Sequence, residues 1–303
     1  MSFNLTARAL AVDSQNNLYV AGQFNQYNGS TFNRVGIWNG TSWVQLGGGV
    51  QNGTVYTLSV DSEDNLYVGG SFNTVNASTM NRIAKWNGTS WSSLGTGLGA
   101  SVNSIAIRPG TNEIYVGGFF STNNYLAKWN GTSWVTVANG LNNAVKAIAF
   151  DSSGDNLYVG GWFSSAGGVS ATRIAKLDIS TETWSAFGSG ADGDVNAIVF
   201  DSAGNLHIGG NFTTANGVTV NGTAKWDGTQ FNPLGSGVLG NIYTLTIDSS
   251  DNLYVGGFIY YVDGASTTSG YYAVAKWNGS SWEKLVEFNS GTYAILAKQR
   301  PIR

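Results

Sequence analysis

A short motif recurs six times along the 303 residues of this chain and limits what the chain can fold into. Its copies are NLYVAGQF from Asn17, NLYVGGSF from Asn65, EIYVGGFF from Glu113, NLYVGGWF from Asn156, NLHIGGNF from Asn205 and NLYVGGFI from Asn252. Successive copies begin 43 to 49 residues apart. A period of this length is typical of repeat architectures, in which each copy is one supersecondary unit. The unbroken repeat therefore predicts a single domain over residues 1–303.

Each repeat predicts four antiparallel strands. Residues 55–60 alternate in side-chain character with the period of a strand, and the polar turn that begins at Asp61 leads into the strand LYVGG. A third strand runs into Asn87-Gly88, and Trp91 begins the fourth. Asn-Gly between strand residues is a strong hairpin signal, because a type I′ turn needs two residues with positive φ.

Four strands in each of six repeats predict an all-β fold, a six-bladed β-propeller with four antiparallel strands per blade. The predicted blades are residues 5–50, 51–98, 99–141, 142–191, 192–238 and 239–288, and residues 289–303 are predicted to form an extra strand and a C-terminal tail. We expect residues 7–12 to be the first strand of blade one. The extra strand, residues 293–298, then either reinforces the contact between blades six and one or pairs outside the domain. The alternative is that it completes blade one and that the N-terminal segment lies elsewhere.

The order of these elements resembles the kelch repeat. The likeness is closest in the fourth repeat, where LYVGG from Leu157 is followed by KLDISTETW from Lys176 to Trp184. The other repeats differ, because they place a tryptophan before a shorter Asn-Gly or Asp-Gly turn. The resemblance implies a propeller that serves as a partner-binding platform or surface module and, more rarely, as an enzyme scaffold.

Composition excludes several classes of function. The net charge of -3 provides no basic surface for nucleic acid, and the absence of cysteine excludes disulfides and thiolate metal sites. No stretch approaches 18 apolar residues, and the first residues have no charged segment followed by a long apolar one, so we expect neither a membrane span nor a signal peptide. We predict no cofactor and no metal site, although calcium in the Asp-rich turns is a minor alternative.

Most of the chemically interesting residues occupy repeat positions and are predicted to be scaffold. Ten of the eleven tryptophans fall in two repeated positions, where Leu177 and Phe231 are the apolar replacements. The only histidine, His207, stands where five other repeats have tyrosine, so we expect it to form a structural hydrogen bond. The repeated turn aspartates and third-strand lysines are expected to pair. We predict no catalytic residue, because a glycosidase needs two carboxylates converging on one cleft.

Residues that the repeat does not require are better candidates for function. The loop of residues 260–272 is rich in tyrosine, and in a closed ring blade six adjoins blade one. Trp162 is the one tryptophan outside the repeated positions. The predicted binding residues are Tyr27, Phe32, Trp162, Tyr260, Tyr261, Tyr271 and Tyr272. Tyrosine suits both protein and glycan partners, and the alternative interpretation is packing within the loops.

The sequence thus predicts a non-catalytic binding or structural module. It would present its loops at an exposed surface, such as a virion, a phage or a cell envelope, since charged residues make up only 11% of the chain. The expected partner is a protein or a surface glycan, with assembly through the C-terminal strand as a further expectation. The alternatives are a lectin-like propeller that binds carbohydrate and, as the minority interpretation, a glycan-active enzyme.

Overall fold

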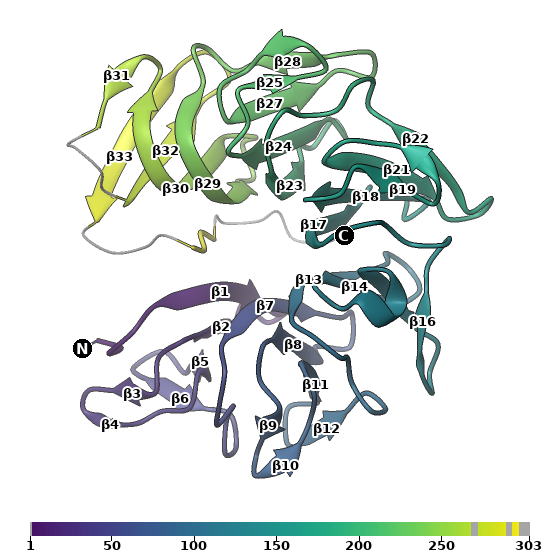
Figure 1. Ribbon diagram of the computed structural model, residues 1–303. Helices are drawn as coiled ribbons and strands as arrows, with labels where there is room; N and C mark the ends of the chain where they lie inside the picture. The colour runs from purple at the N-terminus through teal and green to yellow at the C-terminus, as the bar shows by residue number, and fades with distance from the viewer. Residues whose placement is uncertain (1, 268–271, 289–292, 297–303) are drawn as a thin grey trace. The chain divides into compact units, whose positions relative to one another are not determined.

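The chain is an all-β, six-bladed β-propeller, as predicted (Figure 1). The computed structural model describes residues 2–267, 272–288 and 293–296. Within these residues each blade is an antiparallel sheet of four principal strands, and one short 3-10 turn is the only helical element. The chain divides into two compact units, Met1–Gly140 and Leu141–Arg303, and each unit carries three blades.

The first unit holds blades one to three. Blade one is β1 (Ala7–Val12), β2 (Leu18–Gly22), β5 (Val35–Trp38) and β6 (Trp43–Gln45). Blade two is β7 (Val55–Val60), β8 (Leu66–Gly70), β11 (Ile83–Trp86) and β12 (Trp91–Ser93), and blade three is β13 (Val102–Ile107), β14 (Ile114–Gly118), β15 (Leu126–Trp129) and β16 (Trp134–Thr136). The connections between second and third strands carry the small hairpins β3 (Gln26–Tyr27) with β4 (Ser30–Thr31) and β9 (Thr74–Val75) with β10 (Ser78–Thr79), and the 3-10 turn η1 (Ser121–Asn123).

The second unit holds blades four to six. Blade four is β17 (Val145–Phe150), β18 (Asn156–Gly161), β21 (Ile174–Asp178) and β22 (Thr183–Ala186), and blade five is β23 (Val195–Phe200), β24 (Leu206–Gly210), β27 (Thr223–Trp226) and β28 (Phe231–Pro233). Their small hairpins are β19 (Ser165–Ala166) with β20 (Val169–Ser170) and β25 (Thr214–Ala215) with β26 (Val218–Thr219). Blade six is β29 (Val238–Ile247), β30 (Leu253–Val262), β32 (Tyr272–Trp277) and β33 (Trp282–Phe288), and β31 (Ala265–Ser266) pairs with β30.

The glycine that follows Leu-Tyr-Val-Gly, or its equivalent, in each second strand is required by a close backbone approach. In blade two the first strand shifts register between Val55 and Thr57, where it faces Gly69 and Gly70 of β8. A Cβ added at Gly70 would collide with the Thr54 carbonyl oxygen. The same collision with a carbonyl recurs at the equivalent glycines of the other blades, Gly22, Gly118, Gly161, Gly210 and Gly257. The recurring diglycine therefore lets the bulged first strand lie against the second.

Blades pack face to face within each unit through apolar side chains and tryptophan hydrogen bonds. In the first unit Val68 and Phe72 of blade two share a core with Val35 and Leu46 of blade one. The fourth-strand tryptophan also donates its indole N–H to a carbonyl of the preceding blade. These bonds join Trp91 to Leu46 at 2.9 Å, Trp134 to Leu94 at 3.1 Å and Trp282 to Leu234 at 2.6 Å. None of the ten repeat tryptophans is exposed, which confirms their prediction as scaffold.

The two ends of the chain contribute differently to the sheets. β1 pairs with β2 and completes blade one, as predicted for residues 7–12. The described part of the predicted C-terminal strand, residues 293–296, forms no strand, and residues 297–303 lie outside the described residues. The Tyr293 ring stacks on Tyr243 of β29 with centroids 5.0 Å apart.

A buried carboxylate fixes the hairpin between first and second strands. Asp61 accepts hydrogen bonds from the backbone N–H groups of Glu63 and Asn65, from the Asn65 side chain and from the Tyr67 hydroxyl at 3.0 Å. We call an aspartate in this position a turn carboxylate. Asp13, Asp151, Asp201 and Asp248 hold the same position in blades one, four, five and six. Burial and the neighbouring Asp13 carboxylate raise the pKa of Tyr19 to about 12 in blade one.

We expect Asp61→Ala to lower the free energy of unfolding by about 2 to 3 kcal/mol, because it leaves the buried Tyr67 hydroxyl and Asn65 amide without their acceptor. Urea unfolding monitored by tryptophan fluorescence measures the loss. Asp155→Ala, at an exposed position in the corresponding turn of blade four, is the matched control and should change stability by less than about 0.5 kcal/mol. Equal losses in the two variants would contradict the role of the turn carboxylate.

Candidate functional site

The single histidine is part of the scaffold, as predicted. His207 is 5% exposed, and its Nε2 lies 3.2 Å from Oδ2 of the turn carboxylate Asp201. Burial opposes ionisation of Asp201, but hydrogen bonds from Lys225, Asn205 and His207 hold its pKa well below the usual value. Since an ionised carboxylate only accepts hydrogen bonds, Nε2 carries the proton. The buried Nδ1 has no hydrogen-bond partner, so the neutral imidazole is the form that fits this site.

Lysines of the third strand pair with acids of the hairpin in two blades. Lys225 Nζ lies 2.9 Å from Asp201, and Lys128 forms an ion pair with Glu113, which also pairs with Arg108 at 3.0 Å. The Lys225–Asp201 contact confirms the predicted pairing in blade five. In blade three Lys128 pairs instead with Glu113, which is not one of the repeated turn aspartates. No group of three or more potential metal ligands occurs among the described residues. No helix in the same part of the chain has the length and hydropathy to cross a membrane.

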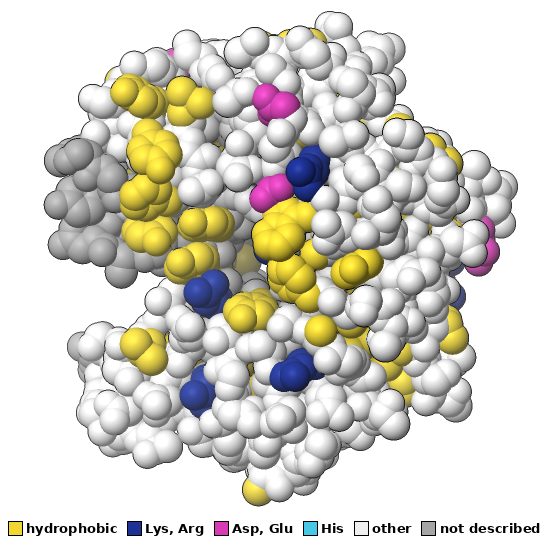
Figure 2. Space-filling model, in the orientation of Figure 1, with side chains coloured by type: hydrophobic (Ala, Val, Ile, Leu, Met, Phe, Trp, Pro, Cys, Tyr) yellow, Lys and Arg dark blue, Asp and Glu magenta, His cyan; other side chains and the backbone are white. Residues whose placement is uncertain are grey.

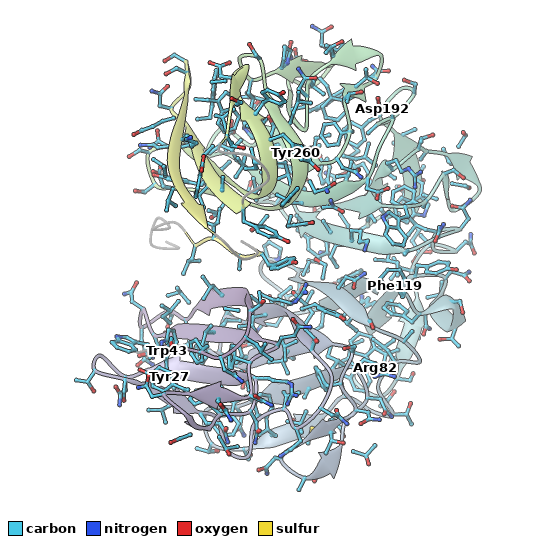
Figure 3. The ribbon with its side chains drawn as sticks, turned by 60° about the vertical axis from the view of Figure 1, so that its left-hand side comes forward. Tyr27, Trp43, Arg82, Phe119, Asp192 and Tyr260 are labelled. Carbon is cyan, nitrogen blue, oxygen red and sulfur yellow. The ribbon has the colours of Figure 1, made fainter. Side chains whose placement is uncertain are left out.

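The predicted binding residues of blade one lie in an aromatic cluster. Phe32 is 5% exposed and packs with Phe24 and with Phe3, whose ring also contacts the half-buried Tyr27 at 5.2 Å. Trp43 touches the same Phe3 ring at 5.7 Å, and Figure 3 shows Tyr27 and Trp43 together on this blade. These side chains contact one another within the first unit.

The predicted residues of blade six belong to the second unit and are more exposed. Tyr260 and Tyr261 of β30 are 46% and 45% exposed, whereas Tyr272 of β32 is half-buried. Tyr260 and Tyr272 each contact the Phe258 ring at 5.2 Å, so an aromatic row crosses two strands of the blade. Tyr271 lies outside the described residues. Figure 2 shows hydrophobic side chains gathered over this blade.

Four other blades place a polar residue where blade six has Leu239. In blade four, Asn142 Oδ1 accepts hydrogen bonds from the N–H groups of Ser164 at 3.0 Å and Ser165 at 3.1 Å, directly after the buried Phe163. We call this side chain the capping residue. Asn4 caps Asn25 and Gln26, Asn52 caps Asn73 and Thr74, and Asp192 caps Thr213 and Thr214.

Asp192 also binds the hydroxyl of a residue that it caps. Partial burial opposes its ionisation, but the Thr213 hydroxyl and the two capped N–H groups hold its pKa below the usual value. The Thr213 hydroxyl donates to Asp192 Oδ2 at 2.6 Å.

Blade six replaces this polar arrangement by sheet pairing and apolar side chains. Leu239 directly follows Val238, as Asn142 and Asp192 follow the equivalent bridge residues, and it pairs with Tyr261 as the sheet continues. Tyr260 and Tyr261 stand where blade four has the two capped serines. Blade six thus differs from blade four at three positions, and at each of them an apolar or aromatic residue replaces a polar one.

These three residues line a groove of about 1000 Å³ in the second unit. Its other walls are blade-six residues Gly240, Asn241, Ser266 and Thr267 and blade-five residues Asn211, Phe212 and Thr213. Figure 3 shows Tyr260 on blade six and Asp192, which binds Thr213, on blade five. The described lining contains amides, hydroxyls and tyrosines, and it includes no carboxylate and no imidazole.

Trp162 lies apart from the groove lining, on blade four of the same unit. It is 36% exposed, and Lys146 Nζ lies 4.0 Å above its ring, a cation–π contact. Burial lowers the pKa of Lys146. Arg173 donates to the Trp162 carbonyl at 2.5 Å and lies 3.6 Å from Asp194. The Asp194 N–H bonds the side chain of Asn211, so a series of contacts leads from Trp162 to the groove.

Sequence reasoning found the two tyrosines but missed the residues around them. Leu239, Asn241, Asn211 and Ser266 were not predicted, although each lines the groove. For Leu239 a signal was present, because aligning the repeats places a leucine where blades one, four and five have Asn or Asp. Blade two has Gln51 there, and its capping residue Asn52 follows directly. The contribution of blade five depends on packing between blades, which the repeat pattern does not specify.

Comparisons with known proteins agree with the fold. Residues 132–296, more than half of the chain, match the family model described as the Rax2 C-terminal beta propeller domain. The chain is thus a β-propeller by its strands and by its sequence. It belongs to the family of the Rax2 C-terminal beta propeller domain. Comparison with curated proteins finds no match.

Two solved structures share the fold at low sequence identity. One is titled Crystal Structure of Mitotic Checkpoint Complex, with a TM-score of 0.60 and 13% identity over 96% of this chain and 81% of that chain. The other is titled Crystal structure of RRP9 WD40 repeats, with a TM-score of 0.59 and 14% identity over 95% of this chain and 82% of that chain. These findings support a propeller family and do not single out the kelch repeat.

We expect acid to destabilise the wild-type protein more than the variant His207→Tyr. Burial lowers the pKa of His207 in the fold, so its contribution to stability is complete above about pH 6.5 and is lost as the pH falls below that value. Tyrosine, which occupies this position in the other blades, does not titrate there. Urea unfolding of both proteins at pH 7.5 and pH 5 measures the difference.

The stability of His207→Tyr relative to wild type should rise on going from pH 7.5 to pH 5. Because the chain has one histidine, no other imidazole contributes to this difference. A relative stability that stays constant or falls over this range would contradict the buried, neutral imidazole.

Proposed function

We propose that this chain is a non-catalytic binding module that takes a partner in the groove over blades five and six. The observation that carries the proposal is the departure of blade six from the repeat at Leu239, Tyr260 and Tyr261. In four blades a polar capping residue accepts hydrogen bonds from the backbone of the equivalent segment. The scaffold therefore does not require exposed tyrosine rings in this position. Exposed apolar groups that the fold does not need are typical of interaction sites.

The chemistry of the lining supports binding without catalysis. Hydrolysis of a glycosidic bond uses two carboxyl groups that face each other across the substrate. The described residues around the groove supply none, and the nearby Asp192 is engaged by Thr213 and Thr214. Aromatic rings beside amides and hydroxyls instead match the composition of surfaces that recognise partners.

Display at an exposed surface, such as that of a cell or virion, is part of the proposal and is supported by composition. Charged residues are scarce, at 11% of the chain. The kelch-like character of the repeat is also part of the proposal. The turn at Asp178 in blade four supports it, because Asp178 Oδ1 accepts hydrogen bonds from the N–H groups of Ser180 and Thr181. Assembly through the C-terminal strand stays a prediction.

We expect the double variant Tyr260→Ala, Tyr261→Ala to lose binding at least tenfold while its melting temperature stays within about 2 °C of wild type, because both rings are nearly half exposed. The probes are a displayed random peptide library and a printed array of neutral and anionic glycans. Val169→Ala, an exposed apolar position on blade four outside the groove, is the matched control.

Binding by wild type and control but not by the double variant would support the groove as the site. The proposal fails if no probe binds wild type, or if every bound probe binds the double variant equally well. A melting temperature lowered by 8 °C or more would show that the two tyrosines belong to the core.

A further inference from the structure

The groove over blades five and six has a specific hydrogen-bonding character. Its polar lining consists of side-chain amides and hydroxyls, and none of its described lining residues is charged. Its volume of about 1000 Å³ is at the upper end of the range of about 300 to 1000 Å³ for small-molecule sites. This is room for a ligand of several rings rather than one.

Some of these polar groups are used within the fold and others remain available. The Thr213 hydroxyl donates to Asp192, and the buried Thr267 hydroxyl donates to the Ile259 carbonyl at 2.7 Å. By contrast, among the described residues the side chain of Asn241 makes no hydrogen bond, and Asn211 uses only Oδ1, which accepts from the Asp194 N–H at 2.6 Å. Each available amide has donors and acceptors that match ligand hydroxyls, which both donate and accept.

The backbone of both tyrosines and the ring of Tyr260 are held in place before any ligand arrives. The Phe258 ring meets the Tyr260 ring edge-on at an interplanar angle of 89°. The Tyr260 carbonyl accepts hydrogen bonds from the backbone N–H of Thr267 at 2.8 Å and from its hydroxyl at 3.0 Å. The backbone of Tyr261 is fixed by pairing with Leu239 and Ser266. Rings on a paired strand lose little conformational entropy on binding.

Charge near the groove disfavours an anionic ligand. The Asp192 carboxylate lies directly behind Thr213, and Asp194 is bonded to Asn211 through its backbone. Two cations act on Asp194: Arg173, which is 3.6 Å from it and also bonds the Trp162 carbonyl, and Lys146. Asp192 is instead bonded by the neutral residues Thr213 and Thr214. A sulfate, phosphate or carboxylate group would therefore approach negative charge at the blade-five wall.

The geometry also disfavours a protein partner. β29 and β30 are paired with each other along the floor, so an extended peptide finds no free backbone edge there. A stable protein interface buries about 1200 to 2000 Å² around an apolar core, whereas the exposed apolar groups here are two tyrosine rings and part of Leu239.

We propose that the groove binds a neutral oligosaccharide, with sugar rings stacked on Tyr260 and Tyr261 and hydroxyls read by Asn211 and Asn241. The inference rests on the proposed binding function and gives it a ligand class. The apolar face of a pyranose ring covers an aromatic face, while its hydroxyls require amide partners at the rim. The groove supplies both an aromatic surface and side-chain amides.

The test is calorimetric titration of the full chain with free oligosaccharides. The neutral probes are cellohexaose, maltohexaose, mannohexaose and N-acetylated chitohexaose, and the anionic probes are sialyllactose and a heparin hexasaccharide. We expect at least one neutral probe to bind, with an affinity that changes less than twofold between 50 and 500 mM NaCl, since no ion pair forms.

Four variants locate the site. Tyr261→Ala and Asn241→Ala should each weaken binding about tenfold or more, whereas Tyr261→Phe, which keeps the stacking face, and the blade-four control Val169→Ala should stay within about twofold of wild type. A neutral probe that binds equally well to Tyr261→Ala would overturn the inference, as would binding confined to the anionic probes.

Failure of this inference and failure of the binding function give different results. If no saccharide binds but peptides selected from a random library bind in a Tyr261-dependent manner, the ligand class is wrong and the groove remains a binding site. If neither saccharides nor peptides bind, both proposals fall.

Discussion

The turn carboxylate between the first two strands is the interaction on which the rest of the propeller depends. A buried carboxylate is costly unless all its acceptor positions are used, and Asp61 achieves this with two backbone N–H groups, one Asn amide and one Tyr hydroxyl. In five blades the satisfied carboxylate holds the turn from which the first two strands pair. Blade three has Arg108 in this position, and there the ion pair with Glu113 at 3.0 Å spans the turn. The adjacent serine then links the hairpin to the next blade, as Ser14 does through Asp64 at 2.7 Å and Ser202 through Asp251 at 2.5 Å.

A scaffold built from repeated polar contacts makes departures from the repeat easy to interpret. The capping residue joins the entry of a blade to the segment after its buried Phe, and in blade six an extended sheet takes over this task. β29 and β30 are each ten residues long, compared with five or six in the other blades. Because strand pairing fixes the backbone here, the side chains of Leu239, Tyr260 and Tyr261 are not needed for capping hydrogen bonds. They can therefore be selected for binding, at little cost to the fold.

The sequence was sufficient for the fold because the same local signals recur from repeat to repeat. The Asn-Gly turns, the diglycines and the tryptophan positions each specify a strand boundary, and their agreement leaves one architecture. The links between blades were harder to predict. The Ser62 hydroxyl, for example, donates a hydrogen bond to the side chain of Asn112, fifty residues further along the chain, and no repeated sequence pattern indicates this contact. The site was predicted in part. The exposed tyrosines were recognised as departures from the repeat, but the blade-five wall around Asn211 depends on how neighbouring sheets stack.

The central claim is that the three blade-six residues are not required by the scaffold. The most direct measurement is the free energy of unfolding of the variant Leu239→Asn, Tyr260→Ser, Tyr261→Ser, which gives blade six the residues of blade four. The account predicts a change of less than about 1 kcal/mol, because surface substitutions away from buried groups cost little. A loss of about 3 kcal/mol or more would contradict it, since a loss of that size comes from removing buried core packing.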